Sequence, residues 1–511
     1  MGERVTRGGP ALLVAATAGV LLVLPASGAG TAPTERVSVA TGGAQANGNS
    51  VAPAISKDGR YVAFYSTATN LIGGDTNRAR DVFVHDRQTG ATTRVSVAND
   101  GSQANGESFA PAISGDGRYV AFSSSASNLV AGDQNGADDI FVRDRVANTT
   151  TRVSIGLGGA EPNAGSFAPA ISADGNVVAY ESDATNLVSG DTNGVRDVFV
   201  FDRTNGSTAR VSVSTAGDEG DAPSGQAALD ADGGIVAYSS FADNLITLDE
   251  NFTADVFVFE RATHTTTRVS VYTGDFEADG NSFHPSLSAD GRLVAYDSDS
   301  FNLAWFDPDE GADVYVWDRV AGAISNVSAD DAGNLGNDTS QWPSMSSDGR
   351  YVAYQTEATD IVPGDQNGVG DIVIYDRQSG AVDRLSLTNS GDEADNESIH
   401  PSISGDGKLV AYESLAANLV SGDSNHFNDV FVRDTTLNPP PPAKRCVVPR
   451  VIGLRLAVAK KRITRANCRV GKVKRVHVRS KRKVGHVIAQ SPRAKTRHAA
   501  GTRVKLSIGR R

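Results

Sequence analysis

The fold of this chain can be predicted from Ala52-Pro-Ala-Ile-Ser-Lys-Asp-Gly-Arg-Tyr-Val-Ala-Phe64, a stretch that returns with substitutions along most of the sequence. Its Asp-Gly pair recurs at a constant step of 58 residues. The seven aspartates are Asp58, Asp116, Asp174, Asp232, Asp290, Asp348 and Asp406. A fixed period of this kind indicates a repeat architecture. Residues present in every copy are therefore expected to be structural, and function should be sought where the copies differ.

Each repeat is predicted to form four β-strands and no helix. In the first copy, 53–56 and 60–65 are short runs rich in β-forming residues, joined by the turn dipeptide Asp58-Gly59. Residues 81–86 alternate apolar and polar side chains, and 93–97 form an outer strand. Four-stranded units with short, regular turns predict a β-propeller, whose radial closure leaves few exposed sheet edges.

The ends of the array indicate how the ring closes. The outer-strand motif Arg-Val-Ser first occurs at Arg36, before any complete repeat, and no copy follows the last repeat, which ends at Asp434. The simplest interpretation is that the N-terminal strand completes the last blade. This gives a seven-bladed propeller over residues 30–438. An open solenoid is the alternative, and it would leave an unpaired strand at each end.

The repeat pattern Ala-Pro-Ala-Ile-Ser-x-Asp-Gly-Arg-Tyr-Val-Ala-Phe resembles the TolB-type (WD40-like) propeller repeat of bacterial envelope proteins. The resemblance covers roughly residues 36–434. It implies an all-β propeller but no single activity, because propellers support binding, scaffolding and catalysis alike.

Residues 1–29 are predicted to be a secretory signal peptide. Arg4 and Arg7 precede an uncharged apolar run from Pro10 to Pro25, and small residues at 27–29 provide a cleavage site. The run is shorter than the ~20 residues that a membrane-spanning helix needs, and an uncleaved anchor is the alternative. The mature chain is therefore expected to have no membrane span and to be secreted, either extracellular or associated with the cell wall.

Composition changes abruptly after four prolines at 439–442, which predict a stiff linker. Residues 443–511 hold 23 of the 48 Lys and Arg residues and none of the 60 Asp and Glu residues. The formal charge is +23 for this segment and −35 for the first 442 residues, which together give −12. Such a segment attracts anionic polymers, and less strongly as salt rises.

The basic segment is predicted to be a small α+β domain. Val448-Pro-Arg-Val-Ile-Gly453 is extended, 454–466 have helical apolar spacing, and 485–492 and 501–508 are strand-like. This order of motifs resembles a PASTA domain, which implies peptidoglycan or another anionic wall polymer as the partner of residues 443–511. Two departures leave the ligand open: the usual acidic residues are missing, and Arg493-Ala-Lys-Thr496 replaces a glycine-containing turn.

The two cysteines of the chain, Cys446 and Cys468, flank the predicted helix. In an exported protein they are expected to form a disulfide. Closing a loop of this size stabilises a domain by about 3 kcal/mol, which matters for so short a segment. Free thiols for metal or redox chemistry are the alternative, but the sequence has no Cys-x-x-Cys motif and no cysteine–histidine cluster to support it.

A polar loop motif, Asp75-x-Asn77-x-x-x-Asp81 in the first copy, recurs in all seven repeats, and in the fifth its residues are Asp307, Asp309 and Asp313. Oxygen ligands at alternate loop positions could begin a calcium shell, which needs six to eight oxygens. The other interpretation is a turn in which short polar side chains bond the loop backbone. Apart from calcium, no cofactor is expected.

One position within the period breaks the symmetry. Its occupants are Ala52, Ala110, Ala168, Gln226, His284, Trp342 and His400. If this position faces the central channel, the last four side chains are candidates for binding a protein or glycan partner, because each combines contact area with a polar group. Drift at a half-exposed repeat position is the alternative.

Three classes of function follow from these features. The preferred one is an exported, non-enzymatic envelope protein that binds the wall through residues 443–511 and a partner through the propeller. The alternative is a secreted carbohydrate- or peptide-active enzyme, for which no unique carboxylate pair and no catalytic triad is evident. Nucleic acid is not expected as a physiological partner, because the basic segment has no aromatic residue for base stacking.

Overall fold

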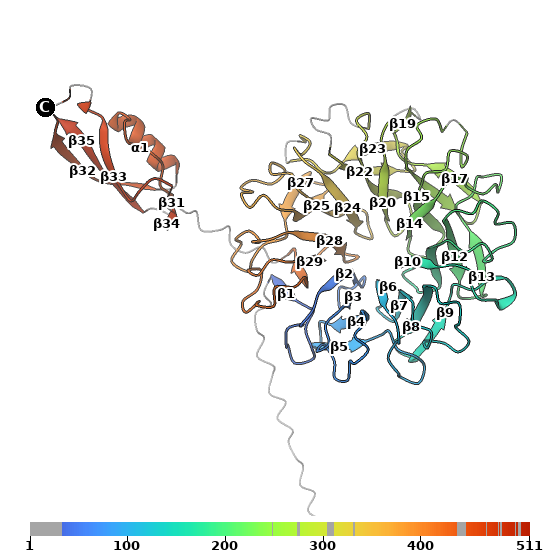
Figure 1. Ribbon diagram of the computed structural model, residues 1–511. Coiled ribbons are helices and arrows are strands. Elements are labelled where there is room, and N and C mark those ends of the chain that lie inside the picture. Colours follow the sequence, from blue (N-terminus) through green and yellow to red (C-terminus); the bar gives the residue numbers. More distant parts are fainter. Residues whose placement is uncertain are drawn as a thin grey trace, which may run out of the picture. The chain divides into compact units, whose positions relative to one another are not determined.

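The computed structural model describes residues 33–247, 249–272, 276–303, 311–330, 333–436, 446–466, 468–478, 480, 483–495, 497–498 and 502–510. Seven four-stranded antiparallel sheets form a ring, and a separate small sheet carries one helix (Figure 1). The predicted all-β seven-bladed propeller and small α+β domain are therefore confirmed. The predicted signal peptide, the proline linker, Asp307 and Asp309 lie outside the described residues.

Each blade repeats one order of strands, counted outwards from the centre of the ring. The innermost strands are β2 (Ser50–Ile55), β6 (Ser108–Ile113), β10 (Ser166–Ile171), β14 (Ser224–Leu229), β20 (Ser282–Leu287), β24 (Ser340–Met345) and β28 (Ser398–Ile403). The second strands are β3 (Tyr61–Ser66), β7 (Tyr119–Ser124), β11 (Val177–Ser182), β15 (Ile235–Ser240), β21 (Leu293–Ser298), β25 (Tyr351–Thr356) and β29 (Leu409–Ser414).

The two outer layers follow the same rule. The third strands are β4 (Asp81–Asp86), β8 (Asp139–Asp144), β12 (Asp197–Asp202), β16 (Asp255–Glu260), β22 (Asp313–Asp318), β26 (Asp371–Asp376) and β30 (Asp429–Asp434). The outer strands are β5 (Ala91–Arg94), β9 (Thr149–Arg152), β13 (Ser207–Arg210), β17 (Thr265–Arg268), β23 (Ala323–Asn326), β27 (Ala381–Arg384) and β1 (Thr34–Arg36). A 3-10 turn, η1 (Leu157–Gly159), and the short pair β18 (Val271–Tyr272) and β19 (Phe276–Glu277) lie in connections between blades.

Strand β1 belongs to the last blade although it comes first in the chain. It pairs with β30 in the sheet β1-β30-β29-β28, with Arg36 opposite Phe431. Figure 1 shows β1, in blue, beside the orange strands of the last blade. The Ser38 hydroxyl donates to a carboxylate oxygen of Asp429 at 2.5 Å. Both ends of the propeller chain thus meet in one sheet, which covers the edge that β30 would otherwise expose.

A closed ring of backbone hydrogen bonds links all seven blades. The residue before each turn aspartate donates its N–H to the carbonyl oxygen of the equivalent residue in the next blade, at 2.8 to 3.1 Å. These residues are Lys57, Gly115, Ala173, Ala231, Ala289, Ser347 and Gly405, and Gly405 donates back to Lys57. Because each bond spans one repeat, a length change in this part of any blade would break the ring.

Six of the seven hairpin turns are fixed by the Ser-x-Asp-Gly motif, and the fourth has Asp230 in place of the serine. In the first blade, the Ser56 hydroxyl donates to Asp58 at 2.6 Å, and the same carboxylate oxygen accepts the N–H of Arg60 at 3.0 Å. Gly59 has a φ of 73°, and a Cβ there would lie 2.2 Å from Leu409 of the neighbouring blade. Glycine is therefore required both by the backbone and by the close approach of two blades.

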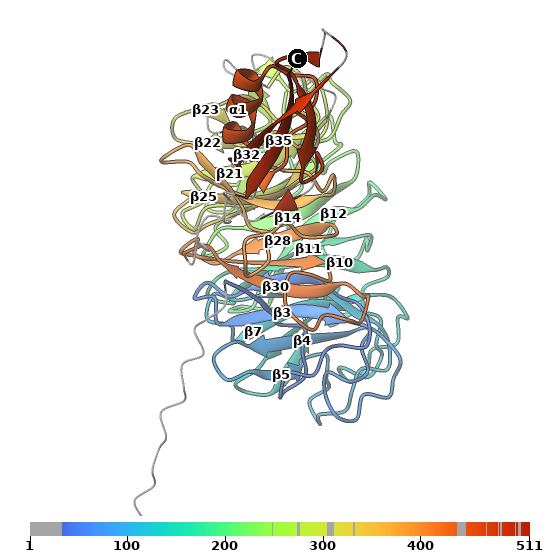
Figure 2. The same cartoon turned by 90° about the vertical axis from the view of Figure 1, so that its left-hand side faces the viewer.

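Apolar side chains fill the seams between blades. At the closing seam, Phe64 and Phe83 of the first blade pack with Ala411, Val430 and Val432 of the last. Figure 2 shows β3, which carries Phe64, beside β30, which carries Val430 and Val432. Each blade buries its faces against two neighbours, so the core of the propeller is a circle of seven equivalent interfaces.

The C-terminal domain has a three-stranded sheet in the order β32 (Arg469–His477), β35 (Arg503–Arg510) and β33 (Val487–Ser491). Helix α1 (Leu456–Arg465) packs Ala459 and Ile463 against Val487, Val504 and Leu506. Two short strands, β31 (Cys446–Val447) and β34 (Arg497–His498), pair beside it. Within the described part of the chain, no helix is long and apolar enough to span a membrane.

One glutamine of β33 holds the extended segment that opens this domain. The Gln490 side-chain amide donates to the Pro449 carbonyl at 2.9 Å and accepts the N–H of Val451 at 2.8 Å. Cys468 is buried just after α1. The side chain of Cys446 lies outside the described residues, so the pairing of Cys446 with Cys468 stays a prediction.

Removing β1 is expected to destabilise the whole propeller. A chain that begins at Val39 leaves the β30 edge open and loses the Ser38–Asp429 contact, whereas a chain that begins at Pro33 keeps both. We expect the shorter chain to melt at least ~5 °C lower and to self-associate through the open edge, as measured by calorimetry and light scattering. Equal melting temperatures and monomeric behaviour for both chains would contradict the closure.

Candidate functional site

A β-bulge in every innermost strand aims one side chain into the centre of the propeller. In β2 the pairing with β3 shifts between Val51 and Ala54, so two residues face one. The first bulged residue of each blade has a positive φ, between 46° and 57°. These seven residues are Ala52, Ala110, Ala168, Gln226, His284, Trp342 and His400. Bulges re-aim side chains in this way at many binding sites, and this is the position that the sequence analysis singled out.

All seven bulged residues line one cavity of about 640 Å³. The bulge position is uneven, because three blades place only a methyl group there whereas Gln226, His284, Trp342 and His400 are large and adjacent. The first three blades line the cavity with Tyr65, Phe109 and Glu181 from other positions. Trp342 remains 38% exposed, so its ring is accessible from the cavity. The structure thus brings the four candidate residues together on one side of the channel mouth.

The large side chains form a continuous row of rings. His284 stacks on Trp342 with ring centroids 3.7 Å apart, and Trp342 meets His400 edge-on at 4.6 Å. The row extends outwards from His284 to Phe283 and then to Phe241, each step about 6 Å between centroids. Phe241 is itself 46% exposed. Flat aromatic surfaces of this kind suit stacking against a planar group or a sugar ring.

Carboxylates hold both histidines of the row. The Nδ1 of His284 lies 2.9 Å from an oxygen of Asp297, and that of His400 lies 3.1 Å from an oxygen of Glu413. Asp297 and Glu413 are almost fully buried on the second strands. A carboxylate on one ring nitrogen fixes the orientation of an imidazole and leaves Nε2 as the nitrogen available for a ligand.

The same second-strand position also anchors the bulge of the following blade. Asp297 accepts the backbone N–H of Trp342 at 3.0 Å, Gln355 accepts that of His400 at 3.1 Å, and Glu413 accepts that of Ala52. At the fourth seam, Gln226 itself accepts the N–H of His284 at 3.1 Å. These bonds compensate in part for the unfavourable backbone at the bulge.

The sequence analysis missed these anchoring residues. Glu181, Asp297 and Glu413 occupy one repeat position where other blades have tyrosine, serine or glutamine. Glu181 also lines the cavity, and burial raises the pKa of its carboxyl. The signal that could have revealed them is a variable polar residue within a strand whose neighbours are apolar.

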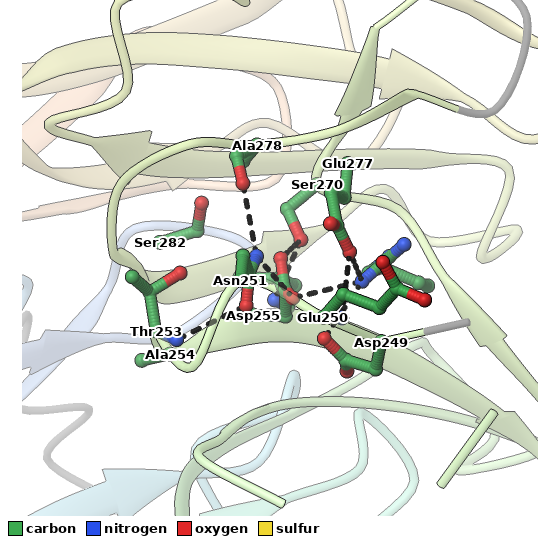
Figure 3. Close-up of polar contacts among 12 residues, drawn as sticks. Asp249, Glu250, Asn251, Thr253, Ala254, Asp255, Ser270, Glu277, Ala278 and Ser282 are labelled. Atoms are coloured by element: carbon green, nitrogen blue, oxygen red, sulfur yellow. Dashed lines mark hydrogen bonds and ion pairs between the residues drawn. The ribbon is translucent and has the colours of Figure 1, made fainter. Parts of the chain in front are cut away.

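An arginine side chain holds the Asp-x-Asn-x-x-x-Asp loop, for which the sequence analysis considered calcium. In the fourth blade, Nη1 of Arg268 lies 3.0 Å from Asp249, 3.1 Å from Asp255 and 3.1 Å from Glu277. Asn251 donates to Asp255 at 3.1 Å and to the Ala278 carbonyl at 2.9 Å (Figure 3). Arg94 of the first blade contacts Asp75 and Asp81 in the same way, and Asn77 donates to Asp81. The guanidinium supplies the positive charge that a calcium ion would bring, and the described residues contain no group of three or more metal-binding side chains.

Burial, together with nearby carboxylates, raises the pKa values of several aspartates in these clusters. Burial raises the pKa of Asp249 to about 6, with Asp255 adding to the shift and Arg268 opposing it. The pKa values of Asp133 and Asp371 are also raised to about 6, chiefly by burial. The opposite holds at the outer turns, where hydrogen bonds from Arg118 lower the pKa of Asp144 to about 2.

The C-terminal sheet carries a second, basic site. Lys472 and Lys474 of β32 and Lys505 of β35 line a cavity of about 240 Å³, together with Gln490 and Ser491. No carboxylate lines it. Three ammonium groups beside amide and hydroxyl groups form a surface suited to an anionic or polyhydroxylated polymer.

The raised carboxyl pKa values predict a specific pH dependence of stability. In unfolded chains aspartate has a pKa of about 3.9, so the stability from Asp249, Asp133 and Asp371 is full below about pH 4 and is lost as pH rises through about 6. We expect the melting temperature to be a few degrees higher at pH 5 than at pH 7.5.

Two variants check the origin of this difference. Asp249→Asn removes one titrating group and should reduce the difference, whereas Asp144→Asn removes a carboxylate whose contribution is lost only below about pH 4. The latter should leave the difference unchanged although it lowers stability at both values. Equal melting temperatures for the unmodified protein at pH 5 and 7.5 would contradict the assignment.

Comparison with known proteins identifies the C-terminal domain. Residues 447–510 match the PASTA domain family. A search of curated protein sequences gave no match to the chain. Among solved structures, TolB from Acinetobacter baumannii is 17% identical with a TM-score of 0.34, and the match covers 59% of this chain and 61% of that one.

Two further solved structures are similar, also with low sequence identity. A putative TolB from Agrobacterium tumefaciens is 14% identical with a TM-score of 0.37, over 67% of this chain and 93% of that one. The β-propeller domain of the Trilobed protease from Pyrococcus furiosus is 10% identical with a TM-score of 0.47, over 76% and 95%. The count of blades rests on the strand pairing itself. The chain is thus a seven-bladed β-propeller followed by a domain whose residues 447–510 match the PASTA family.

Proposed function

We propose that this protein is an exported, non-enzymatic component of the cell envelope. The PASTA domain attaches it to peptidoglycan or an anionic wall polymer, and the propeller binds a protein or glycan partner at the channel mouth. The observation that carries the propeller's role is the one-sided row of His284, Trp342 and His400 on the cavity wall.

The one-sidedness of the mouth supports binding over simple repeat drift. At the bulge position, random drift would scatter large side chains around the ring, but here they occupy four consecutive blades and touch one another. They are also supported from behind by Asp297, Gln355 and Glu413. A site built of both exposed rings and buried supporting groups has the organisation expected of a recognition surface.

The attachment role is supported by charge and by the PASTA match. The domain's resemblance implies a wall polymer, and the +23 charge of residues 443–511 adds attraction to polyanions. The lysine-lined cavity on the sheet is the place in this domain where charge and concave shape coincide. We also propose that Cys446 and Cys468 form a disulfide in the exported protein.

A second candidate function has a specific observation in its favour. His284–Asp297 and His400–Glu413 are the carboxylate–imidazole pairs with which many enzymes hold a general base. Both lie on an open cavity beside Trp342. A secreted carbohydrate- or peptide-active enzyme therefore remains the alternative. Release of reducing sugar or peptide from wall material, abolished by Asp297→Asn, would establish it.

The attachment proposal is tested by sedimentation with purified cell walls. Full-length protein and residues 443–511 are expected to pellet with the walls, whereas residues 30–438 stay in solution at about 0.15 M salt. If residues 443–511 remain in the supernatant, wall attachment through the PASTA domain is wrong.

Three lysines are expected to carry most of this attachment. Replacing Lys472, Lys474 and Lys505 with glutamine should weaken wall binding about tenfold, because the charges around the 240 Å³ cavity are lost together. The matched control replaces Lys460, Lys461 and Arg462 of α1, which removes the same charge from residues that do not line the cavity. Equal losses for both triple variants would indicate non-specific attraction instead of a site.

The channel mouth is tested with exported proteins and soluble wall fragments as probes. Trp342→Ala and His400→Ala should each weaken binding about tenfold, because each removes a ring from the row. Phe252→Ala is the control, since Phe252 is 80% exposed but does not line the cavity. Titration calorimetry gives the affinities, and unchanged binding by Trp342→Ala would eliminate the mouth as the site.

A further inference from the structure

Another cavity of the propeller lies at the seam between the sixth and seventh blades. At one repeat position there, the seventh blade has no arginine although the other six blades do. Six blades carry an arginine directly after the third strand: Arg87, Arg145, Arg203, Arg261, Arg319 and Arg377. In each, an Nη1–H donates to the carbonyl oxygen of the turn glycine in the same blade. In the seventh blade the residue is Thr435, whose hydroxyl donates to the Gly407 carbonyl at 3.2 Å.

The arginines also contact the preceding blade. The guanidinium carbon of Arg145 is 4.4 Å from the ring centroid of Tyr61, and that of Arg203 is 4.2 Å from the ring of Tyr119. Each tyrosine also contacts the arginine before it in sequence, at 4.7 Å for Arg60. Tyr61 and Tyr119 are therefore each in contact with two guanidinium groups, one from each side of the seam.

Tyr351 is the equivalent residue in the sixth blade. It keeps Arg350 at 4.7 Å, but the chain provides Thr435 where Arg145 stands at the first seam. A cavity of about 400 Å³ lies here, lined by Tyr351, Asp348, Asp376, Asp406, Lys408 and Thr435 among others. Its lining contains four carboxylates, counting Asp383, against the two cationic groups of Arg350 and Lys408.

The first and sixth seams are built alike except at the missing residue. Arg60 forms two hydrogen bonds to Asp86, at 2.9 and 2.7 Å, and Arg350 forms the same pair to Asp376, at 2.9 and 2.8 Å. The aromatic ring, the paired carboxylate and the turn glycine are thus kept, while the second guanidinium is not. The two seams with the same tyrosine and a second arginine, at Tyr61 and Tyr119, show which chemical group this geometry accepts.

We propose that the cavity at the sixth seam binds the guanidinium of an arginine side chain presented by a polypeptide. The ring of Tyr351 would provide a cation–π contact, and the excess of carboxylates would balance the charge. Arginines of residues 443–511 and arginines of a separate protein offer the same group, so the experiment must tell these sources apart. This site is separate from the channel mouth and does not depend on the function proposed for it.

The direct test is titration of the full chain with N-acetyl-arginine methylamide. We expect saturable binding at one site in the millimolar range and none for the citrulline analogue, which has the same shape without the charge. Thr435→Arg should abolish binding and raise the melting temperature, because it restores the side chain of the other six blades. Absence of saturable binding, or binding unaffected by Thr435→Arg, would overturn the proposal.

Two further variants separate a specific site from general attraction. Tyr351→Leu should weaken binding about tenfold, and the fold tolerates leucine because Leu293 and Leu409 occupy this position in other blades. Tyr119→Leu is the control, since Arg203 already covers that ring. Arg145→Thr should create a second site and raise the stoichiometry from one to two; a stoichiometry that stays at one would count against the proposal.

The source of the arginine is identified by a chain in which every arginine from 443 to 511 is changed to lysine. Tighter probe binding by this chain than by the unmodified protein would show that the protein's own C-terminal region competes for the site. Equal affinity would show that the site is free for a separate protein. Both results depend on the direct titration succeeding first.

Discussion

The closed ring of seven backbone hydrogen bonds from Lys57 to Gly405 is the constraint on which the rest of the molecule depends. Each bond advances the chain by one blade, and the seventh must return to the first. A residue added within one of these turns would displace its donor, so the length of the turn segment must be the same in every blade. The same ring places the apolar seams and the channel-mouth bulges at equal intervals around the propeller.

The ring also explains why chain order and spatial order differ at one place. Six blades are made from consecutive strands, but the seventh takes β1 from the start of the propeller. Hydrogen bonds along β1–β30 and apolar packing between Phe64 and Val430 close the circle at two different radii. The last blade can therefore unfold only if strand β1 is released from its sheet. This dependence makes the seven sheets one cooperative unit.

Much of this could be predicted from the sequence, because the relevant signals lie within one repeat. The period gave the number of blades, and the variable position gave Gln226, His284, Trp342 and His400. The supporting residues stand out in the sequence as variable polar positions within apolar strands, but their contacts could not be predicted, since Asp297 and Trp342 are on different blades and meet only when the ring is formed. The arginine clusters were missed for a related reason: Asp249 and Arg268 are brought together by strand pairing, so their sequence motifs had no visible connection.

Support of each bulge by the preceding blade has a consequence for how the mouth can change. The side chain at 297 touches its own histidine and also holds the backbone under Trp342 in the next blade. Ligand preference therefore depends on pairs of residues from two neighbouring blades, not on the residues of a single blade. A transplanted blade would carry half of two such pairs, so redesign of the mouth should exchange two neighbouring blades together and keep their shared seam intact.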